Sequence, residues 1–199
     1  VFADNFRGLM LTLRTLPILT LAAGLLVPVS AQAQQQLLPA QSSIEFAAKQ
    51  MGVPMQGHFR KFDAQLSFDP AKPESSRIRF SVDTGSATMG ARETDAELPK
   101  PVWFNVAQFP QATFESSTIK ALGGGKFDVA GKLTIKGTSV NVSVPVVLTQ
   151  SGATTTATGV LPIKRLAFKI GDGEWADTSM VADEVQVKFK LALTGVGKI

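Results

Sequence analysis

Two segments decide the fold of this chain: WFNVAQFPQATF at residues 103–114 and VAGKLTIKGTSVNVSVPV at residues 129–146. In the second segment apolar residues alternate with polar ones, which is the period of a strand with one buried face. The first segment brings four large aromatic rings into a dozen residues: Trp103, Phe104, Phe109 and Phe114. We therefore expect strands that wrap one apolar interior, with an aromatic connector leading into them.

The same alternation appears on both sides of these segments. It predicts strands near residues 44–48, 57–68, 78–82 and 185–193, while Gly123-Gly124-Gly125 predicts a hairpin turn. Residues 34–42 are polar and contain Pro39, which indicates a frayed terminus or a short lead-in. The alternation is lost in the 83–108 connector, where short helical turns are expected. The pattern as a whole predicts an all-β barrel or sandwich, and a closed barrel is favoured because it leaves no exposed edges.

Composition excludes several classes of site. The 199 residues contain no cysteine, so disulfides, zinc–thiolate sites and a cysteine nucleophile are all excluded. The formal net charge of +4 is spread over single lysines rather than basic clusters. This pattern indicates a solvated surface, with no nucleic-acid partner and at most peripheral contact with an anionic membrane.

The N-terminal segment has the pattern of an export signal. Arg14 precedes an apolar run at residues 16–29, which ends before the small-residue pattern Ala31-Gln32-Ala33. The run is shorter than the roughly 20 residues that span a bilayer. We expect residues 1–33 to be a signal peptide that is removed, with translation starting at Val1 or Met10, and residues 34–199 to be a single exported domain.

Few residues suggest catalysis. His58 is the only histidine, so a multi-histidine metal site is excluded and a solvent-facing side chain is expected. Asp95 and Glu97 form a carboxylate pair that could perform acid–base chemistry, although an exposed linker more commonly holds solvated or capping carboxylates. The glycine-rich segment 171–173 does not have the ligand spacing of a calcium loop. We therefore expect a protein that is not an enzyme, with no metal site and no cofactor.

Thirteen phenylalanines and no tyrosine indicate a dry interior, because a buried tyrosine hydroxyl would need a hydrogen-bond partner. The sequence leaves two alternatives open at this point. Either the phenylalanine rings fill the interior of the barrel, or they line a cavity for an apolar guest.

In order along the chain, several motifs resemble those of the YceI-like family of exported, lipocalin-like proteins. The resemblance extends from about Leu38 to Leu193, and its motifs are Gly57-His58-Phe59, Asp95-Ala96-Glu97-Leu98, Trp103-Phe104-Asn105, Phe109-Pro110 with residues 113–116, residues 131–137, and residues 163–165 with 173–177 and 183–185. The resemblance implies an eight-stranded antiparallel barrel with an elongated apolar cavity, a periplasmic location, frequent homodimers and no established catalysis. It also implies that the guest is a polyisoprenoid or an isoprenoid-quinone lipid. Pro99 and Pro101 make the connector richer in proline than is usual in the family, so the lip of the cavity is expected to differ in shape.

The candidate binding residues follow from strand parity, which selects inward positions, and from loop position, which selects the lip. The inward set is Phe46, Phe59, Phe68, Phe80, Phe114, Leu133, Val142, Val144, Val187 and Phe189. The lip set is Trp103, Phe104, Phe109 and Trp175. Two rival hypotheses stay open: a stress-related or protein-interaction module whose barrel is filled by its own side chains, and a hydrolase or isomerase that uses Asp95, Glu97 or Arg165.

Overall fold

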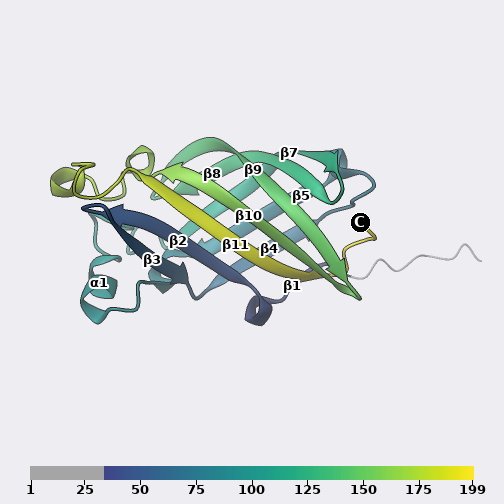
Figure 1. The fold of residues 1–199 in the computed structure, drawn as a ribbon, viewed down its shortest axis with the longest axis horizontal. Coiled ribbons are helices and arrows are strands. Elements are labelled where there is room, and N and C mark those ends of the chain that lie inside the picture. The colour runs from purple at the N-terminus through teal and green to yellow at the C-terminus, as the bar shows by residue number, and fades with distance from the viewer. Residues whose placement is uncertain (1–33) are drawn as a thin grey trace, which may run out of the picture. The chain divides into compact units, whose positions relative to one another are not determined.

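A computed structural model describes residues 34–199, and in it one antiparallel sheet curls around an apolar interior (Figure 1). The predicted signal peptide at residues 1–33 lies outside the described residues. The strands are β1 (Gln36–Leu37), β2 (Ser43–Gln50), β3 (Val53–Phe59), β4 (Phe62–Ser67), β5 (Arg77–Asp83), β6 (Ala87–Thr88), β7 (Gln111–Gly123), β8 (Lys126–Ile135), β9 (Thr138–Ser151), β10 (Thr154–Lys164) and β11 (Glu184–Thr194). The helices are α1 (Arg92–Glu97) and the 3₁₀ turns η1 (Pro39–Gln41), η2 (Pro73–Ser75), η3 (Thr84–Ser86), η4 (Arg165–Phe168) and η5 (Gly173–Trp175).

The all-β architecture is confirmed, but the sheet has eleven strands among the described residues rather than eight. The difference comes from two bends. Only Arg60 and Lys61 separate β3 from β4, and only η3 separates β5 from β6. If each bent pair is counted as one strand and the short β1 is set aside, the eleven strands reduce to eight.

The two bends also bring the sheet back on itself. β3 pairs with β2 while β4 pairs with β5, so the bent segment 53–67 joins the two ends of the strand order β4-β5-β7-β8-β9-β10-β11-β2-β3-β6. The bends are held together by backbone hydrogen bonds from Arg60 N to Ser86 O at 3.2 Å and from Asp83 N to Lys61 O at 3.0 Å. A curled sheet of this kind leaves few free strand edges.

Of the two alternatives for residues 34–42, the structure shows a short, paired lead-in and not a frayed terminus. β1 pairs with β11, and the side-chain amide of Gln35 donates to Phe68 O at 2.6 Å while its carbonyl accepts from Phe68 N at 2.8 Å. The Gln35 side-chain amide thus makes the two hydrogen bonds to Phe68 that the backbone of a neighbouring strand would make, one residue beyond the end of β4. The segment joins β11 to the β4 side of the sheet, a long-range pairing that local alternation cannot reveal.

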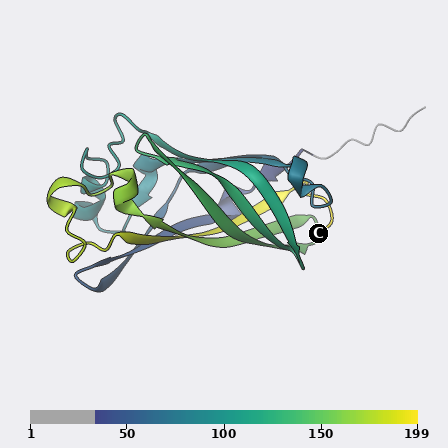
Figure 2. The same ribbon diagram turned by 90° about the horizontal axis from the view of Figure 1, so that it is seen from above.

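The sheet of residues 34–199 has two distinct ends (Figures 1 and 2). The mouth is formed by the β2–β3 turn, the connector 84–110, the β8–β9 turn and the β10–β11 connection at residues 165–183. The base carries β1, the β7–β8 turn and the C-terminus, and there the rings of Phe68 and Phe127 meet edge to face with centroids 5.4 Å apart. None of the helices in this part of the chain has the length and hydropathy needed to cross a bilayer.

Three phenylalanine rings lie over glycines of the neighbouring strand. A Cβ atom built on Gly57 would lie 2.2 Å from the ring of Phe46, its cross-strand partner. The equivalent distance is 2.4 Å between Gly159 and the ring of its partner Phe189, and 2.6 Å between Gly131 and the ring of Phe114. Each ring thus covers a strand position that has no side chain. Part of the ring volume therefore lies against the sheet instead of filling the interior.

We expect Gly57→Ala to destabilise the protein by about 1–3 kcal/mol, because the added methyl group overlaps the Phe46 ring and overpacking costs this much in a well-packed interior. Equilibrium unfolding in urea measures the change. Gly197→Ala is the control: its nearest neighbour would be Pro70 Cδ at an ordinary 3.5 Å, so an effect below about 0.5 kcal/mol is expected. Equal unfolding midpoints for Gly57→Ala and the wild type would refute the close ring–glycine packing.

Candidate functional site: a two-chambered apolar cavity

The interior holds two cavities in line. The inner chamber, toward the base, has a volume of about 190 Å³ and is lined by apolar side chains with Thr155 as the single polar residue. The outer chamber, toward the mouth, has a volume of about 530 Å³. Five apolar residues line both chambers and define a neck between them: Ile44, Val82, Leu133, Leu161 and Val187.

Most of the candidate binding residues lie along these chambers, and each chamber takes a different set. The inner chamber is lined by Phe68, Phe80, Phe114, Val144 and Phe189, and the neck by Leu133 and Val187. The outer chamber is lined by Phe46, Phe59, Trp103, Phe104 and Trp175.

Two candidates, Phe109 and Val142, line neither chamber. The ring of Phe109 lies against Gly137 in the β8–β9 turn, where a Cβ atom would approach it to 2.7 Å. Val142 pairs with Gly131 in the β8–β9 ladder, and the Phe114 ring covers Gly131. Both side chains are half-buried packing residues rather than cavity walls.

Sequence reasoning missed part of the lining. Ile44, Leu66, Ile78 and Val82 line the chambers on the same strand faces as the candidates, so parity could have included them. The outer chamber is also lined by residues of the connector and the β10–β11 connection, where no period exists: Met89, Thr94, Leu98, Ile170 and Val181. Their positions depend on how the two connections fold over the mouth.

The β10–β11 connection is built around a buried guanidinium. Arg165 is only 2% exposed and lines the outer chamber. Its five N–H groups donate to five backbone carbonyls at 2.6–3.1 Å, those of Ile170, Gly171, Trp175, Val181 and Ala182. Burial lowers the pKa of Arg165, and the nearby Asp183 carboxylate opposes this effect. Because every donor is occupied, the guanidinium has no N–H left for a ligand or for catalysis.

The two connections are joined across the mouth. Gly171 N donates to Val102 O at 2.7 Å, and the rings of Trp103 and Trp175 lie with centroids 5.6 Å apart. Lys136, in the β8–β9 turn, donates from Nζ to Lys169 O at 2.5 Å and to Val102 O at 3.3 Å. Burial lowers the pKa of Lys136, and Asp172, whose Oδ2 lies 3.8 Å from Nζ, partly offsets the shift. The mouth is therefore one connected structure.

The carboxylate pair of the connector is also engaged in structure. Asp95 accepts from the buried Thr88 hydroxyl at 2.5 Å and from Met89 N at 2.6 Å, which fixes α1 beside β6. Glu97 pairs with Lys100 at 2.5 Å. His58 is exposed on β3, and within residues 34–199 no group of three or more histidine or acidic side chains could hold a metal ion. The arrangement is suited to binding an apolar molecule.

Comparisons with known proteins agree with this architecture. Residues 36–193 match the family model described as the YceI-like domain. The crystal structure of BcnA from Burkholderia cenocepacia is similar with a TM-score of 0.76 and 49% sequence identity, over 78% of this chain and 98% of that one. A polyisoprenoid binding domain from Saccharophagus degradans, implicated in plant cell wall breakdown, aligns with a TM-score of 0.65 and covers 81% of this chain and 98% of that one. Its sequence identity is 16%, so the likeness shows the fold alone.

Among sequence relatives, the UPF0312 protein of Azotobacter vinelandii is 34% identical over 139 residues, which cover 68% of this chain and 70% of that protein. A UPF0312 protein of Yersinia pestis is 36% identical over 110 residues, 55% of this chain and 57% of its own length. The chain thus matches little more than half of the Yersinia relative.

We expect Asp95→Asn to lower the melting temperature at neutral pH, because the amide cannot accept both of the hydrogen bonds that fix α1. Hydrogen bonds from Thr88 and Met89 hold the pKa of Asp95 below its ordinary value of 3.8. The folded state therefore binds fewer protons than the unfolded state near that pH. The contribution of Asp95 is complete above pH 3.8 and is lost as the pH falls through the depressed pKa.

Melting temperatures of the wild type and Asp95→Asn should therefore converge as the pH falls below about 4. Asp63→Asn, at an exposed position of β4, is the control and should leave the pH profile unchanged. A constant difference between wild type and Asp95→Asn across this range would show that the carboxylate is not the source of the stabilisation.

Proposed function

This chain belongs to the YceI-like domain family, and on that premise we propose that it binds a long polyisoprenoid chain, free or attached to a quinone, in its two chambers. The observation that carries the proposal is the pair of chambers joined by an apolar neck. A compact ligand would fit one chamber, whereas a long chain can occupy both. At about 0.8 kcal/mol per buried CH₂, burying several isoprene units supplies affinity without any charged anchor.

The rival hypotheses are less well supported by the geometry. A barrel filled by its own side chains would leave no sizeable interior space, yet part of the aromatic volume lies against strand glycines and the interior holds cavities of about 190 and 530 Å³. A hydrolase or isomerase that uses Asp95, Glu97 or Arg165 would need one of these groups free, yet Asp95 and Arg165 use their hydrogen bonds to hold the fold and Glu97 pairs with Lys100. We propose a binding protein that is not an enzyme.

The cellular context is part of the same proposal. The apolar run and the Ala31-Gln32-Ala33 pattern favour export to the periplasm after removal of residues 1–33. There a carrier or store would shield an isoprenoid chain from water. Membership of the family also favours a homodimer, with no requirement that two copies share one cavity.

The charges around the outer chamber favour a neutral head group. The charged residues of its lining are Lys49, Glu93, Glu97 and Arg165. Arg165 has no free donor, and the Glu93 carboxylate of α1 would repel an anion, whereas Lys100 partly offsets the charge of Glu97. A phosphate is usually held by charge-assisted donors, and only Lys49 of this lining could supply them. We propose a quinone or a prenol rather than a prenyl phosphate.

Blocking the neck tests the chamber assignment. We expect Val187→Trp to keep the fold but to weaken binding of a long isoprenoid quinone by tenfold or more, because displacing even about two CH₂ groups into water costs about 1.6 kcal/mol. A short-chain quinone, which needs only the outer chamber, should bind within about twofold of the wild type. Fluorescence quenching or native mass spectrometry measures both affinities.

Lys188→Trp is the matched control, since Lys188 lies next in β11 with its side chain exposed on the other face. Equal loss of long-chain and short-chain binding in Val187→Trp would contradict a chain that passes the neck. Absence of any isoprenoid binding by the wild type would favour the protein-interaction module instead.

For the head group, we expect a neutral prenol to bind at least about tenfold more tightly than its monophosphate of equal chain length, since like charge at the mouth opposes the phosphate. Glu93→Gln combined with Glu97→Gln should reduce the ratio of prenol affinity to phosphate affinity about threefold. Added salt should reduce the same ratio in the wild type. Glu45→Gln, exposed on β2, is the control. Tighter binding of the phosphate by the wild type would refute the proposed head group.

A further inference from the structure

The turn between β2 and β3 places an apolar residue where the backbone disfavours it. Gln50 pairs with Val53, so Met51 and Gly52 form a two-residue turn, with φ of +49° and +80°. Positive φ at both central residues defines a type I′ turn, which strongly prefers asparagine, aspartate or glycine. A bulky side chain in this region is a strained outlier, and such strain commonly marks a functional position. Met51 is nevertheless 72% exposed to solvent.

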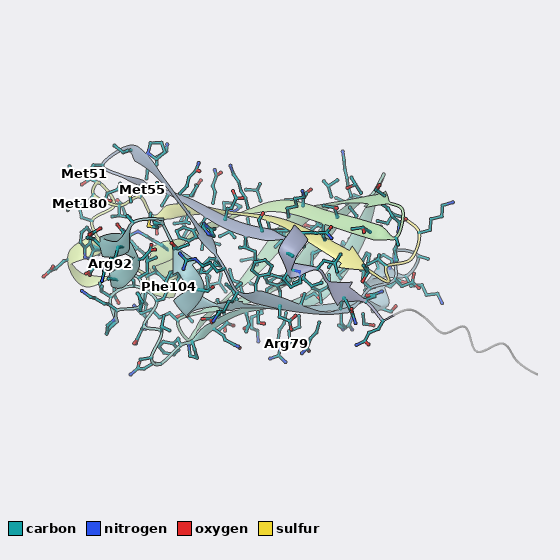
Figure 3. The ribbon with its side chains drawn as sticks, turned by 90° about the horizontal axis from the view of Figure 1, so that it is seen from below. Met51, Met55, Arg79, Arg92, Phe104 and Met180 are labelled. Carbon is teal, nitrogen blue, oxygen red and sulfur yellow. The ribbon has the colours of Figure 1, made fainter. Side chains whose placement is uncertain are left out.

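Met51 belongs to an ordered apolar surface that we call the tip and define as Met51, Val53 and Met180. Val53 is 63% exposed and Met180 is 40% exposed. Met51 N donates to Met180 O at 2.8 Å, and Ala182 N donates to Lys49 O at 2.9 Å. These bonds fasten the β2–β3 hairpin to the β10–β11 connection, and Figure 3 shows Met51 and Met180 at the same end of the molecule.

The tip is continuous with the lining of the outer chamber. Val53, Met55 and Phe59 occupy alternate positions of β3 and therefore share one strand face. Met55 and Phe59 line the outer chamber, as does Val181, the neighbour of Met180. An apolar track thus leads from the chamber along β3 to the most exposed apolar side chains of the mouth.

We propose that the tip docks onto the surface of a lipid bilayer and that the isoprenoid chain enters the outer chamber there. This inference rests on the proposed function for its purpose, since a water-insoluble chain must be taken from a bilayer. The continuity of the tip with the chamber favours a bilayer over a protein partner, because it lets the chain move without crossing water. Flexible methionine side chains adapt to an irregular apolar surface.

Three side chains bury little area, so the docking is weak and reversible. That suits a protein that must leave the membrane with its guest. The exposed Lys49 immediately before the turn adds a cation at the level of the lipid phosphates.

The test combines Met51→Asn with Met180→Gln. An asparagine followed by Gly52 is the preferred type I′ sequence, so the melting temperature of the variant should be equal to or above that of the wild type. Leu122→Thr is the matched control, because Leu122 is 64% exposed near the β7–β8 turn, at the base. All comparisons use the same purified chain, so any contribution of residues 1–33 cancels.

Three measurements separate docking from binding. Flotation with vesicles of phosphatidylethanolamine and a minor share of phosphatidylglycerol, free of isoprenoid, measures docking alone. Transfer of a fluorescent isoprenoid quinone from these vesicles measures entry. Loading with the same quinone from detergent measures the cavity. We expect the double variant to lose about fivefold or more in flotation and transfer rate, with detergent loading within about twofold of the wild type.

Unchanged flotation and transfer in the double variant, or an equal loss in Leu122→Thr, would overturn the docking proposal. If the double variant changed self-association but not flotation, the tip would be assigned to contact with a second copy of the chain. That outcome would also overturn the docking proposal. Failure of the wild type to load from detergent would refute the proposed function, while flotation would still decide whether the tip binds bilayers.

Discussion

The mouth of this barrel depends on one buried positive charge. A guanidinium removed from water is stable only when its donors are matched, and Arg165 is matched by five carbonyls of a single connection, at residues 170–182. Those bonds fix a segment that has little regular structure, and the same segment supplies Ile170, Trp175 and Val181 to the wall of the outer chamber. Through Gly171 it also holds the aromatic connector in place. The shape of the chamber therefore follows from the need to satisfy one side chain.

Much of the fold could be predicted from alternation, because a buried sheet face imposes a period of two on each strand. Alternate strand positions also predicted inward-facing residues such as Phe114 and Phe189, which line the inner chamber. The role of Arg165 could not be predicted, since backbone carbonyls bind it and carbonyls leave no trace in a sequence. The pairing of residues 34–42 was missed for a similar reason: its anchors are β11 and Phe68, both distant along the chain.

The absence of tyrosine and the position of the glycines act together. Phenylalanine carries no hydroxyl to satisfy, so rings can lie beside an empty apolar space without leaving an unpaired polar atom. Within residues 34–199 no buried side-chain nitrogen or oxygen lacks a partner. Because Phe46, Phe114 and Phe189 each cover a glycine, the chain has many rings and still retains open volume. A ring-rich sequence alone cannot distinguish a filled barrel from a hollow one, since the answer depends on which strand positions face the rings.

The two ends of the cavity differ in exposure: the rings that meet at the base are buried, whereas the apolar residues of the hairpin at the mouth are exposed. This difference gives the site a direction. At the base the Phe68 and Phe127 rings cross and the Gln35 amide continues the ladder beyond β4. At the mouth, charged side chains such as Arg165 and Lys136 hydrogen-bond to the backbone of the walls, while Met51 and Val53 are exposed on the β2–β3 hairpin. An apolar chain is least exposed to water during entry where exposed apolar surface continues into the apolar lining. A chain that enters by the mouth would therefore place its tail beyond the neck, with its head group near Lys49 and α1.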